Sequence, residues 1–381
     1  MIEFAQRLHS VKEYYFSTKL KEVRQLIKNG KPIINMGIGS PDLNPPKAVL
    51  SALNESLTSE NAHKYQSYQG LPEFRNAITS FYEHYYNVLL NSETEVLPLM
   101  GSKEGILHIS MALLNEGDGV LIPNPGYPTY TSVTKLVGAS PIFYDLIEDN
   151  NYQPNFKKLE QLDLSRVKIM WVNYPHMPTG TKGTDTTFKQ LIDFGKKHNI
   201  LIVNDNPYSF ILNNTPKSIL AYEGAKDVAL ELNSLSKTFN MAGWRVGMLL
   251  GNKNFIHEIL KVKTQMDSGM FYSIQKGAIA ALETPRSWIV NQNKIYDERK
   301  KLIQKLALKL NCSFSEDTTG LFVWAKLPNE VESADIFINE LLYEKHIFIA
   351  PGHIFGSKGE KYIRFSLCVA TTKIKEAINR V

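Results

Sequence analysis

The chain has little cysteine and no long apolar run. Of its 381 residues only Cys312 and Cys368 are cysteines, and the string C-x-x-C does not occur. Two cysteines cannot build a disulfide framework, and without C-x-x-C the usual zinc and redox motifs are excluded. No apolar run approaches the roughly 20 residues that span a bilayer. The first nine residues lack a continuous apolar stretch, so we expect no secretory signal and a cytoplasmic protein.

An excess of one charge is also missing. The chain has 43 basic and 38 acidic residues, a net charge of +5 and no dense basic run. This balance excludes a strongly basic nucleic-acid-binding protein, and we expect neither a nucleic acid nor a membrane as partner. A hydrophobic content of 43% is ordinary for a globular protein. At roughly 150 residues per domain, the length predicts one large domain and a smaller one.

Short apolar runs alternate with amphipathic stretches through the middle of the chain. The predicted strands are residues 120–123, 167–173, 200–205 and 228–232, and helices are predicted over residues 102–114 and 187–198. Strands that alternate with helices of this length predict a mostly parallel sheet covered on both faces. Beyond residue 285 the pattern changes to a long basic helix over residues 288–310 and short strands such as 320–325, which predicts a smaller α+β domain.

Several familiar motifs are incomplete. Residues 37–42 begin like a dinucleotide fingerprint, but the third glycine is absent and Pro41 prevents an immediate helix. Ser234 and Lys237 match the S-x-x-K of penicillin-binding serine enzymes, but the S-D-N and K-T-G elements do not occur. The nine histidines show no ligand spacing, so we expect no metal site.

Six groups of residues carry a more specific signal. They are residues 101–105, 123–130, 173–180, 205–208, 234–237 with 243–247, and 351–356 with 362–366. On these strings the chain resembles the class I/II aminotransferases, pyridoxal-phosphate enzymes of fold type I, from about Asn35 to the C-terminus. The resemblance implies a three-layer α/β fold with a mostly parallel central sheet, next to the smaller α+β domain.

The resemblance implies catalytic roles for three residues. Pyridoxal 5'-phosphate needs a lysine that holds its aldehyde as a Schiff base, and this lysine would be Lys237. Its freed amine would then move the proton between Cα and the cofactor carbon. Asp205 would keep the ring nitrogen protonated, and Tyr208 would donate to the 3-oxygen. Taken alone, Lys237 is most simply a surface charge and Asp205 a turn or helix cap.

The phosphate of the cofactor needs an anion site. Ser102 and Lys103 open a predicted helix, whose free N–H groups favour a phosphate. Ser234 and Arg245 match the family's further phosphate ligands. Tyr65 matches a tyrosine that in the family reaches the phosphate across a dimer interface. Taken alone, Ser102 is simply an N-cap and Tyr65 an interface or core aromatic.

Four further matches concern the ring and the substrate. Tyr127 matches the aromatic residue that stacks on the pyridine ring. Arg364, mid-strand between hydrophobic neighbours, matches the arginine whose planar fork binds the substrate α-carboxylate. Gly39 matches a backbone contact at the same carboxylate. Tyr14, followed by Tyr15, resembles an N-terminal aromatic that lines the substrate pocket in some subgroups.

One position departs from the family. The usual string N-x-P-x-N-P-T-G has an asparagine that donates to the cofactor's 3-oxygen, and Met177 stands there, preceded by His176. Methionine is no strong donor. Tyr208 would therefore hold the 3-oxygen alone, or with help from His176 or a water. We expect a Schiff-base pKa above that of relatives with asparagine.

The implied activity is transfer of an amino group from an L-α-amino acid to a 2-oxo acid by ping-pong half-reactions. Residues 101–105 and 267–271 look most like the diaminopimelate, aspartate and alanine aminotransferase branches, which indicates an acidic or small donor. Three alternatives remain: a pyridoxal-phosphate β-lyase on the same scaffold, a non-catalytic cofactor-binding protein, and a serine hydrolase, which the missing motifs disfavour.

The resemblance also implies an assembly and a domain plan. We expect a homodimer with active sites at the interface. Residues 1–45 are predicted to form an N-terminal arm and part of the small domain, residues 46–284 the large cofactor-binding domain, and residues 285–381 the small C-terminal domain.

Overall fold

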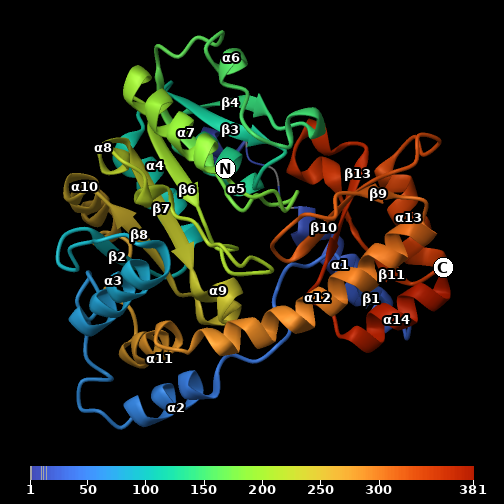
Figure 1. Ribbon diagram of the computed structural model, residues 1–381, viewed down its shortest axis with the longest axis horizontal. Coiled ribbons are helices and arrows are strands. Elements are labelled where there is room, and N and C mark those ends of the chain that lie inside the picture. The colour runs from blue at the N-terminus through green and yellow to red at the C-terminus, as the bar shows by residue number, and fades with distance from the viewer. Residues whose placement is uncertain (1, 10, 12, 14) are drawn as a thin grey trace.

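The chain folds into a larger and a smaller body. The computed structural model describes residues 2–9, 11, 13 and 15–381. Figure 1 shows the larger body around the central sheet, and the smaller one around the C-terminal elements together with α1 (Tyr15–Lys28) and β1 (Ile34–Asn35). Helix α12 (Arg286–Lys309) runs from one body to the other along the lower side of this view. The predicted α/β class with a smaller α+β part is confirmed.

The central sheet has seven strands in the order β2-β8-β7-β6-β5-β3-β4. The strands are β2 (Val96–Leu99), β3 (Gly119–Asn124), β4 (Ser140–Asp145), β5 (Val167–Val172), β6 (Leu201–Asp205), β7 (Ala229–Ser234) and β8 (Gly247–Gly251). Only β8 runs antiparallel to its neighbours within this described sheet. The sequence pattern therefore predicted a mostly parallel sheet correctly, with strand ends that differ by one or two residues.

Helices cover both faces of this sheet because its strands are apolar on both sides. Along β5, Ile169 and Trp171 pack against one layer, whereas Met170 and Val172 pack against the other. The first layer holds α4 (Ser102–Leu113), α5 (Pro128–Leu136) and α10 (Lys253–Lys263). The second layer holds α3 (Pro72–Tyr86) and α7 (Asp185–His198), with α11 (Tyr272–Leu282) and α2 (Lys47–Ser56) packed outside α3. This arrangement makes the three layers that the resemblance implied.

The carboxyl ends of three parallel strands bring polar residues to one edge of the sheet. Asn173 follows β5, β6 ends at Asp205, and β7 ends at Ser234, directly before the short helix α9 (Leu235–Thr238). In open α/β sheets, ligands bind outside such carboxyl ends. Gly247 opens β8 at the same edge, where a Cβ would lie 2.6 Å from the backbone nitrogen of Ser102. Only glycine lets the start of α4 come this close.

The smaller body is built from both ends of the chain. Its sheet has the order β12-β13-β10-β9, and β1 pairs with β11 in parallel. The elements are β9 (Ser313–Phe314), β10 (Phe322–Lys326), α13 (Ala334–Glu344), β11 (Ile347–Phe348), β12 (Ala350–Pro351), η5 (Gly352–Phe355), η6 (Ser357–Gly359), β13 (Tyr362–Ser366) and α14 (Thr371–Arg380). Phe16, Val23 and Ile34 share its core with Ile347 and Phe348. This supports the assignment of part of residues 1–45 to the smaller body; the boundaries themselves stay a prediction.

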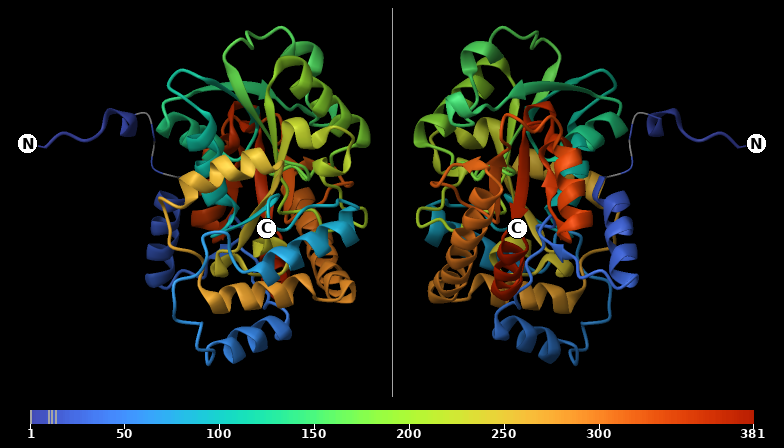
Figure 2. Two further views of the ribbon diagram at one scale, coloured as in Figure 1. Left: turned by 90° about the vertical axis from the view of Figure 1, so that its left-hand side faces the viewer. Right: turned by 90° about the vertical axis from the view of Figure 1, so that its right-hand side faces the viewer.

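The remaining elements are short connections. They are η1 (Gln6–Leu8), η2 (Glu148–Asn150), α6 (Phe156–Leu159), η3 (Ile219–Ala221), α8 (Ala225–Val228) and η4 (Ala242–Trp244). Figure 2 shows the N-terminal segment with η1 projecting away from the rest of the molecule. No helix in the described part of the chain is both long and apolar enough to cross a bilayer.

Candidate active site

A cavity of about 310 Å³ lies where the carboxyl edge of the central sheet meets the smaller body. The polar side chains around it come from loops and strand ends of both bodies. Ten of the twelve predicted site residues line it: Gly39, Ser102, Lys103, Tyr127, Asp205, Tyr208, Ser234, Lys237, Arg245 and Arg364. Residues more than 300 positions apart in the sequence therefore share one cavity.

Lys237 projects into this cavity from α9. Its Nζ donates a hydrogen bond of 2.6 Å to the carbonyl oxygen of Gly39. Burial lowers the pKa of Lys237, and the nearby guanidinium groups of Arg364 and Arg245 lower it further. A lysine in such surroundings has a larger neutral fraction than one in water, and a neutral amine is both a nucleophile and a base.

Asp205 lines the cavity from the end of β6. Its Oδ2 accepts a hydrogen bond of 2.9 Å from the hydroxyl of Tyr130. Its Oδ1 is buried and has no hydrogen-bond partner among the described residues. Burial raises the pKa of Asp205 from 3.8 to about 6, although the Tyr130 hydroxyl and Lys237 act in the opposite direction. Oδ1 can therefore accept a hydrogen bond from a donor inside the cavity, and a cationic donor fits best.

Two tyrosines flank the same space. Tyr208 is buried and packs edge-to-face on Phe322, with 5.8 Å between ring centroids. Tyr127 packs edge-to-face on Tyr130 at 5.5 Å. Burial raises the pKa of both phenols, so each keeps its proton at neutral pH and can donate it in a hydrogen bond.

The opposite end of the cavity is built for an anion. Helix α4 begins at Ser102 after Gly101, whose φ of +93° favours glycine. A Cβ on Gly101 would lie 2.3 Å from an Arg245 guanidinium nitrogen, so this glycine lets the guanidinium lie against the start of the helix. Burial and the charge of Arg245 lower the pKa of Lys103. The free N–H groups of α4, Lys103 and Arg245 concentrate positive potential at one point.

Hydroxyl groups complete this end. Ser234 is buried, and its Oγ donates to the Oγ of Ser236 at 2.8 Å while accepting from the Ser236 backbone N–H at 3.2 Å. Ser234 therefore caps α9 and also lines the cavity. Capping a helix and lining the cavity are therefore compatible roles for Ser234. Ser102, for which the sequence left the simple N-cap role open, is the first residue of α4, whose N-cap is Gly101.

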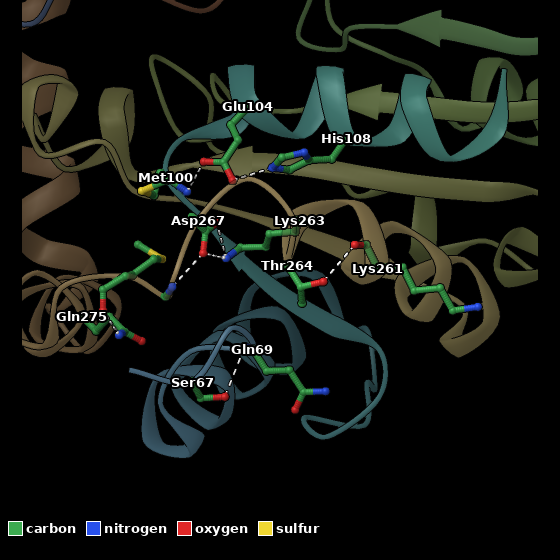
Figure 3. Close-up of polar contacts among 12 residues, drawn as sticks. Ser67, Gln69, Met100, Glu104, His108, Lys261, Lys263, Thr264, Asp267 and Gln275 are labelled. Carbon is green, nitrogen blue, oxygen red and sulfur yellow. Dashed lines mark hydrogen bonds and ion pairs between the residues drawn. The ribbon is translucent and has the colours of Figure 1, made fainter. Parts of the chain in front are cut away.

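The first turn of α4 is held by a polar cluster, shown in Figure 3. Glu104 accepts hydrogen bonds from the backbone N–H of Met100 at 2.8 Å and from His108 Nε2 at 2.7 Å. Asp267 lies close to both side chains and forms a buried ion pair with Lys263, whose Nζ is 2.7 and 2.9 Å from the two carboxylate oxygens. Glu104, His108 and Asp267 have the donor types of a metal site, but the ammonium of Lys263 already neutralises Asp267.

Arg364 stands at the substrate end of the cavity. Its guanidinium lies over the faces of Phe322 and Phe355, at 3.9 and 4.5 Å from the ring centroids. One Nη atom donates to the carbonyl oxygen of Gly37 at 2.9 Å, and the other lies 3.4 Å from the sulfur of Met177. These contacts fix the planar fork, which is the geometry that binds a carboxylate in bidentate fashion.

Comparisons with known proteins agree with this geometry. The family model "Aminotransferase class I and II" matches residues 31–381. The chain belongs to this family. The LL-diaminopimelate aminotransferase of Aquifex aeolicus is 39% identical over 383 residues, covering 100% of this chain and 99% of the relative. This aminotransferase therefore transfers an amino group, as predicted from the sequence.

Solved structures give the same assignment. Apo-BacF of Bacillus subtilis is 35% identical with a TM-score of 0.96, covering 100% of this chain and 98% of that one. An aminotransferase from Staphylococcus aureus is 32% identical with a TM-score of 0.90, covering 99% and 98%. The aspartate aminotransferase of Thermus thermophilus, at 21% identity and a TM-score of 0.93, shows the shared fold.

The departure at Met177 has a clear structural setting in this aminotransferase. Met177 lines the cavity, and its backbone N–H donates to Asn173 Oδ1 at 2.7 Å. His176 is buried beside it, but its ring nitrogens contact Thr179 Oγ1 at 2.8 Å and the Pro125 carbonyl oxygen at 3.2 Å. Burial lowers the pKa of His176 to about 3, so the ring is neutral. His176 is not among the residues that line the cavity, so of the three alternatives for the 3-oxygen the structure favours Tyr208 alone or Tyr208 with a water.

Two predicted residues do not join the cavity. The side chain of Tyr65 is 92% exposed and lies on a separate surface hollow with residues 268–271. Tyr14 lies outside the described residues. Phe16, which directly follows Tyr15, is the aromatic residue of the N-terminal segment that lines the cavity in the structure.

Sequence reasoning missed several lining residues of this aminotransferase. Tyr130 and Asn173 stand inside two of the family strings, so a closer comparison of those strings would have found them. Phe322 and Phe355 reach the cavity from β10 and η5. Phe355 also stands inside one of the family strings, residues 351–356, whereas nothing in the local sequence separates Phe322 from a core phenylalanine.

Proposed function

We propose that this aminotransferase holds pyridoxal 5'-phosphate in the 310 Å³ cavity and uses Lys237 as its reactive amine. The proposal rests on Asp205 Oδ1, which is buried and has no partner among the residues that the structure describes, because a protonated pyridine nitrogen would supply the cationic donor that this oxygen needs. At the other end, Ser102, Lys103 and Arg245 surround the start of α4 as a phosphate would require. The cavity thus fits both ends of the cofactor.

The other proposed cofactor ligands are assigned from their positions in the lining of the cavity. Ser234 would add a hydroxyl to the phosphate site, and Tyr127 would cover one face of the ring. Tyr208 would donate its proton to the 3-oxygen, which it can do because burial raises the pKa of its phenol. Pyridoxal phosphate, when bound, supplies an aldehyde that takes up an amino group and a conjugated ring that accepts electrons.

Lys237 is the proposed proton carrier. Its depressed pKa leaves the amine able to take a proton from the substrate Cα and to deliver it to the cofactor carbon. The Gly39 carbonyl, 2.6 Å from Nζ, would fix the position of the amine in the cavity for this proton transfer. Arg364 binds the α-carboxylate, with the backbone at Gly39 alongside, and so sets the orientation of the Cα–H bond.

The overall reaction has two half-reactions. An L-α-amino acid gives up its amino group and leaves as the 2-oxo acid, and a second 2-oxo acid takes the group in reverse. Relatives named LL-diaminopimelate aminotransferase, 39% to 36% identical over the full chain, make diaminopimelate a second candidate donor. The names of these relatives are the observation that favours diaminopimelate as a donor.

The test is a half-reaction assay. Holoenzyme mixed with a panel of L-amino acids should form one equivalent of 2-oxo acid per site, with a change in the cofactor's visible absorbance. The amino group should then pass to added 2-oxoglutarate. Release of ammonia in place of this transfer would establish the β-lyase alternative, and an unchanged spectrum with every donor would overturn the proposal.

We further propose a homodimer in the cytoplasm, with Tyr65 of each chain reaching the phosphate of the other. The strong exposure of Tyr65 and the exposed position of the Arg245 side chain support such a contact. A Tyr65→Phe variant should weaken cofactor affinity without changing the sedimentation coefficient of a dimer. A monomeric wild-type enzyme with full activity would contradict this arrangement.

A further inference from the structure

The turn from β2 to α4 leads into the proposed phosphate site, and the N-cap residue of α4 is a glycine. β2 ends at Leu99, and α4 begins at Ser102 directly after Gly101. Because glycine has no side chain, the N-cap does not compete with a phosphate for the N–H groups of the first turn. The conformation of this turn, with a φ of +93° at Gly101, must therefore be fixed by other contacts.

Glu104 binds the backbone on both sides of Gly101. Its backbone N–H donates to the Gly101 carbonyl oxygen at 3.2 Å, and its carboxylate accepts from the backbone N–H of Met100 at 2.8 Å. Glu104 is the third residue of α4, the position from which the glutamate of a capping box reaches back over the helix start. Here the carboxylate reaches the residue before the N-cap, so its two bonds enclose the glycine.

The Glu104 side chain is itself held in place, as Figure 3 shows. Its other carboxylate oxygen lies 2.7 Å from Nε2 of His108, which is one turn further along α4 and buried. A carboxylate oxygen of Asp267 lies within 4.8 Å of both groups, and Lys263 neutralises it at 2.7 Å. These neighbours leave the Glu104 carboxylate little freedom to turn away from Met100.

Glu104 contacts the helix start from outside the cavity. In the described part of the chain, Ser102 and Lys103 line the cavity and Glu104 does not. The guanidinium of Arg245 lies against the same glycine, since a Cβ on Gly101 would be 2.3 Å from one of its nitrogens. A shift of this turn would therefore change both the direction of the first-turn N–H groups and the fit of Arg245.

We propose that Glu104 is a positioning residue of the phosphate site, which fixes the start of α4 through the backbone N–H of Met100. The inference rests on the proposed function, because that function places the cofactor phosphate at this point. Two effects of Glu104 oppose each other: its negative charge repels a phosphate, whereas its hydrogen bond holds the phosphate ligands in place. Positioning outweighs repulsion, because the Met100 N–H and His108 compensate the charge.

The test compares pyridoxal phosphate with pyridoxal, which has the same ring and aldehyde but lacks the phosphate. Absorbance titration of the full-length apoenzyme gives both dissociation constants, and the ratio of pyridoxal to pyridoxal phosphate measures the contribution of the phosphate. A partly unfolded fraction affects both constants alike and cancels in this ratio. In Glu104→Ala we expect the ratio to fall at least about tenfold, because a hydrogen bond to a charged group is lost. An unchanged ratio would overturn the proposal.

A conservative variant separates the hydrogen bond from the charge. In Glu104→Gln the amide oxygen can still accept from the Met100 N–H, so we expect the ratio to stay within about threefold of wild type. Glu116→Ala removes an exposed carboxylate beyond the other end of α4 and should leave the ratio unchanged. A higher ratio in both Glu104 variants would mean that repulsion dominates and would overturn the proposal. A loss in Glu104→Gln equal to that in Glu104→Ala would overturn it as well, since the acceptor alone would then not suffice.

Failure of the proposed function would give a different result. The wild-type enzyme would then bind pyridoxal phosphate no more tightly than pyridoxal, and the start of α4 would hold no phosphate. A strong wild-type preference for pyridoxal phosphate that both Glu104 variants retain would leave the proposed function intact and remove only the role of Glu104.

Discussion

The carboxyl group of Asp205 is held by the hydroxyl of Tyr130, which donates to Oδ2 at 2.9 Å and leaves Oδ1 buried without a partner among the described residues. A half-satisfied buried carboxylate costs free energy as long as no donor binds to its second oxygen. That cost is the physical sign of a site shaped for a ligand and not for stability. The same relationship also gives a measurable consequence.

Asp205→Asn should stabilise the apoenzyme while removing activity. The pKa of Asp205 is raised from 3.8 to about 6, so its charged form is penalised in the folded chain by roughly 3 kcal/mol at pH 8. The penalty is full above pH 6, where the folded chain carries the charged carboxylate. It disappears as the pH falls towards 4, because Asp205 is then protonated in the folded chain and increasingly also in the unfolded chain. The gain in melting temperature of apo Asp205→Asn over wild type should therefore be large at pH 8 and vanish near pH 4. Turnover of the holo variant should fall at least about a hundredfold. A destabilised apo variant at pH 8 would contradict this account.

Arg364→Lys should impair donor binding more than cofactor binding. Lysine keeps the charge but loses the planar fork and the stacking on Phe322 and Phe355. We expect kcat/KM for the amino donor to fall about a hundredfold, mainly through KM, with an unchanged absorbance spectrum of the holoenzyme. Steady-state kinetics with spectra of the same preparation check this. A normal KM together with an altered spectrum would place Arg364 at the cofactor instead.

Met177→Asn should shift the pH dependence of the holoenzyme's visible absorbance to lower pH. The amide would add a donor beside Tyr208 at the cofactor's 3-oxygen, and a hydrogen bond to a charged oxygen corresponds to about one pH unit. Met177 lines the cavity, so the new side chain is within the site. Absorbance titration of wild type and variant gives the two midpoints. Identical midpoints would show that residue 177 does not influence the 3-oxygen.

Lys263→Met should destabilise the fold because it leaves Asp267 buried without its cation. Neither side chain of this pair is more than 4% exposed. Breaking such a pair costs about 3–5 kcal/mol. Lys261→Met is the matched control two residues away, since Lys261 forms an exposed pair with Glu258 and should change the free energy of unfolding by less than about 1 kcal/mol. Urea denaturation of both variants measures their free energies of unfolding. Equal values for Lys263→Met and Lys261→Met would mean that the buried pair contributes nothing to stability.

Much of the fold followed from local patterns. The alternation of apolar runs and amphipathic stretches predicted the parallel strands, because a strand buried on both faces needs a continuous apolar run. The pairing of Ile34 with Ile347 did not follow, since no local pattern connects residues so far apart. The parallel pairing of β1 with β11 and the packing of Phe16 and Val23 show how the start of the chain joins the smaller body.

The candidate site was predictable to the extent that its residues stand in short strings. Ten predicted residues meet in one cavity, because strand ends and the start of α4 converge there. Phe322 could not be predicted, since its role depends on packing against Arg364 from another strand. Phe355 stands inside the string 351–356, but its packing against Arg364 is visible only in the structure. His176, one of the alternatives for the 3-oxygen, does not line the cavity because its ring contacts Thr179 and the Pro125 carbonyl, and no sequence pattern reports that orientation.

The most direct test of the central claim is to find which lysine carries the cofactor. Holoenzyme is reduced with borohydride, digested, and analysed by peptide mass spectrometry, with Lys237→Ala and the exposed-site control Lys305→Ala treated alike. We predict a pyridoxyl group on Lys237 in wild type and in Lys305→Ala. Of the two variants, only Lys305→Ala should retain the wild-type turnover. In Lys237→Ala no labelled peptide should appear, and turnover should fall more than about a thousandfold. A pyridoxyl group on another lysine of the wild-type enzyme would contradict the account.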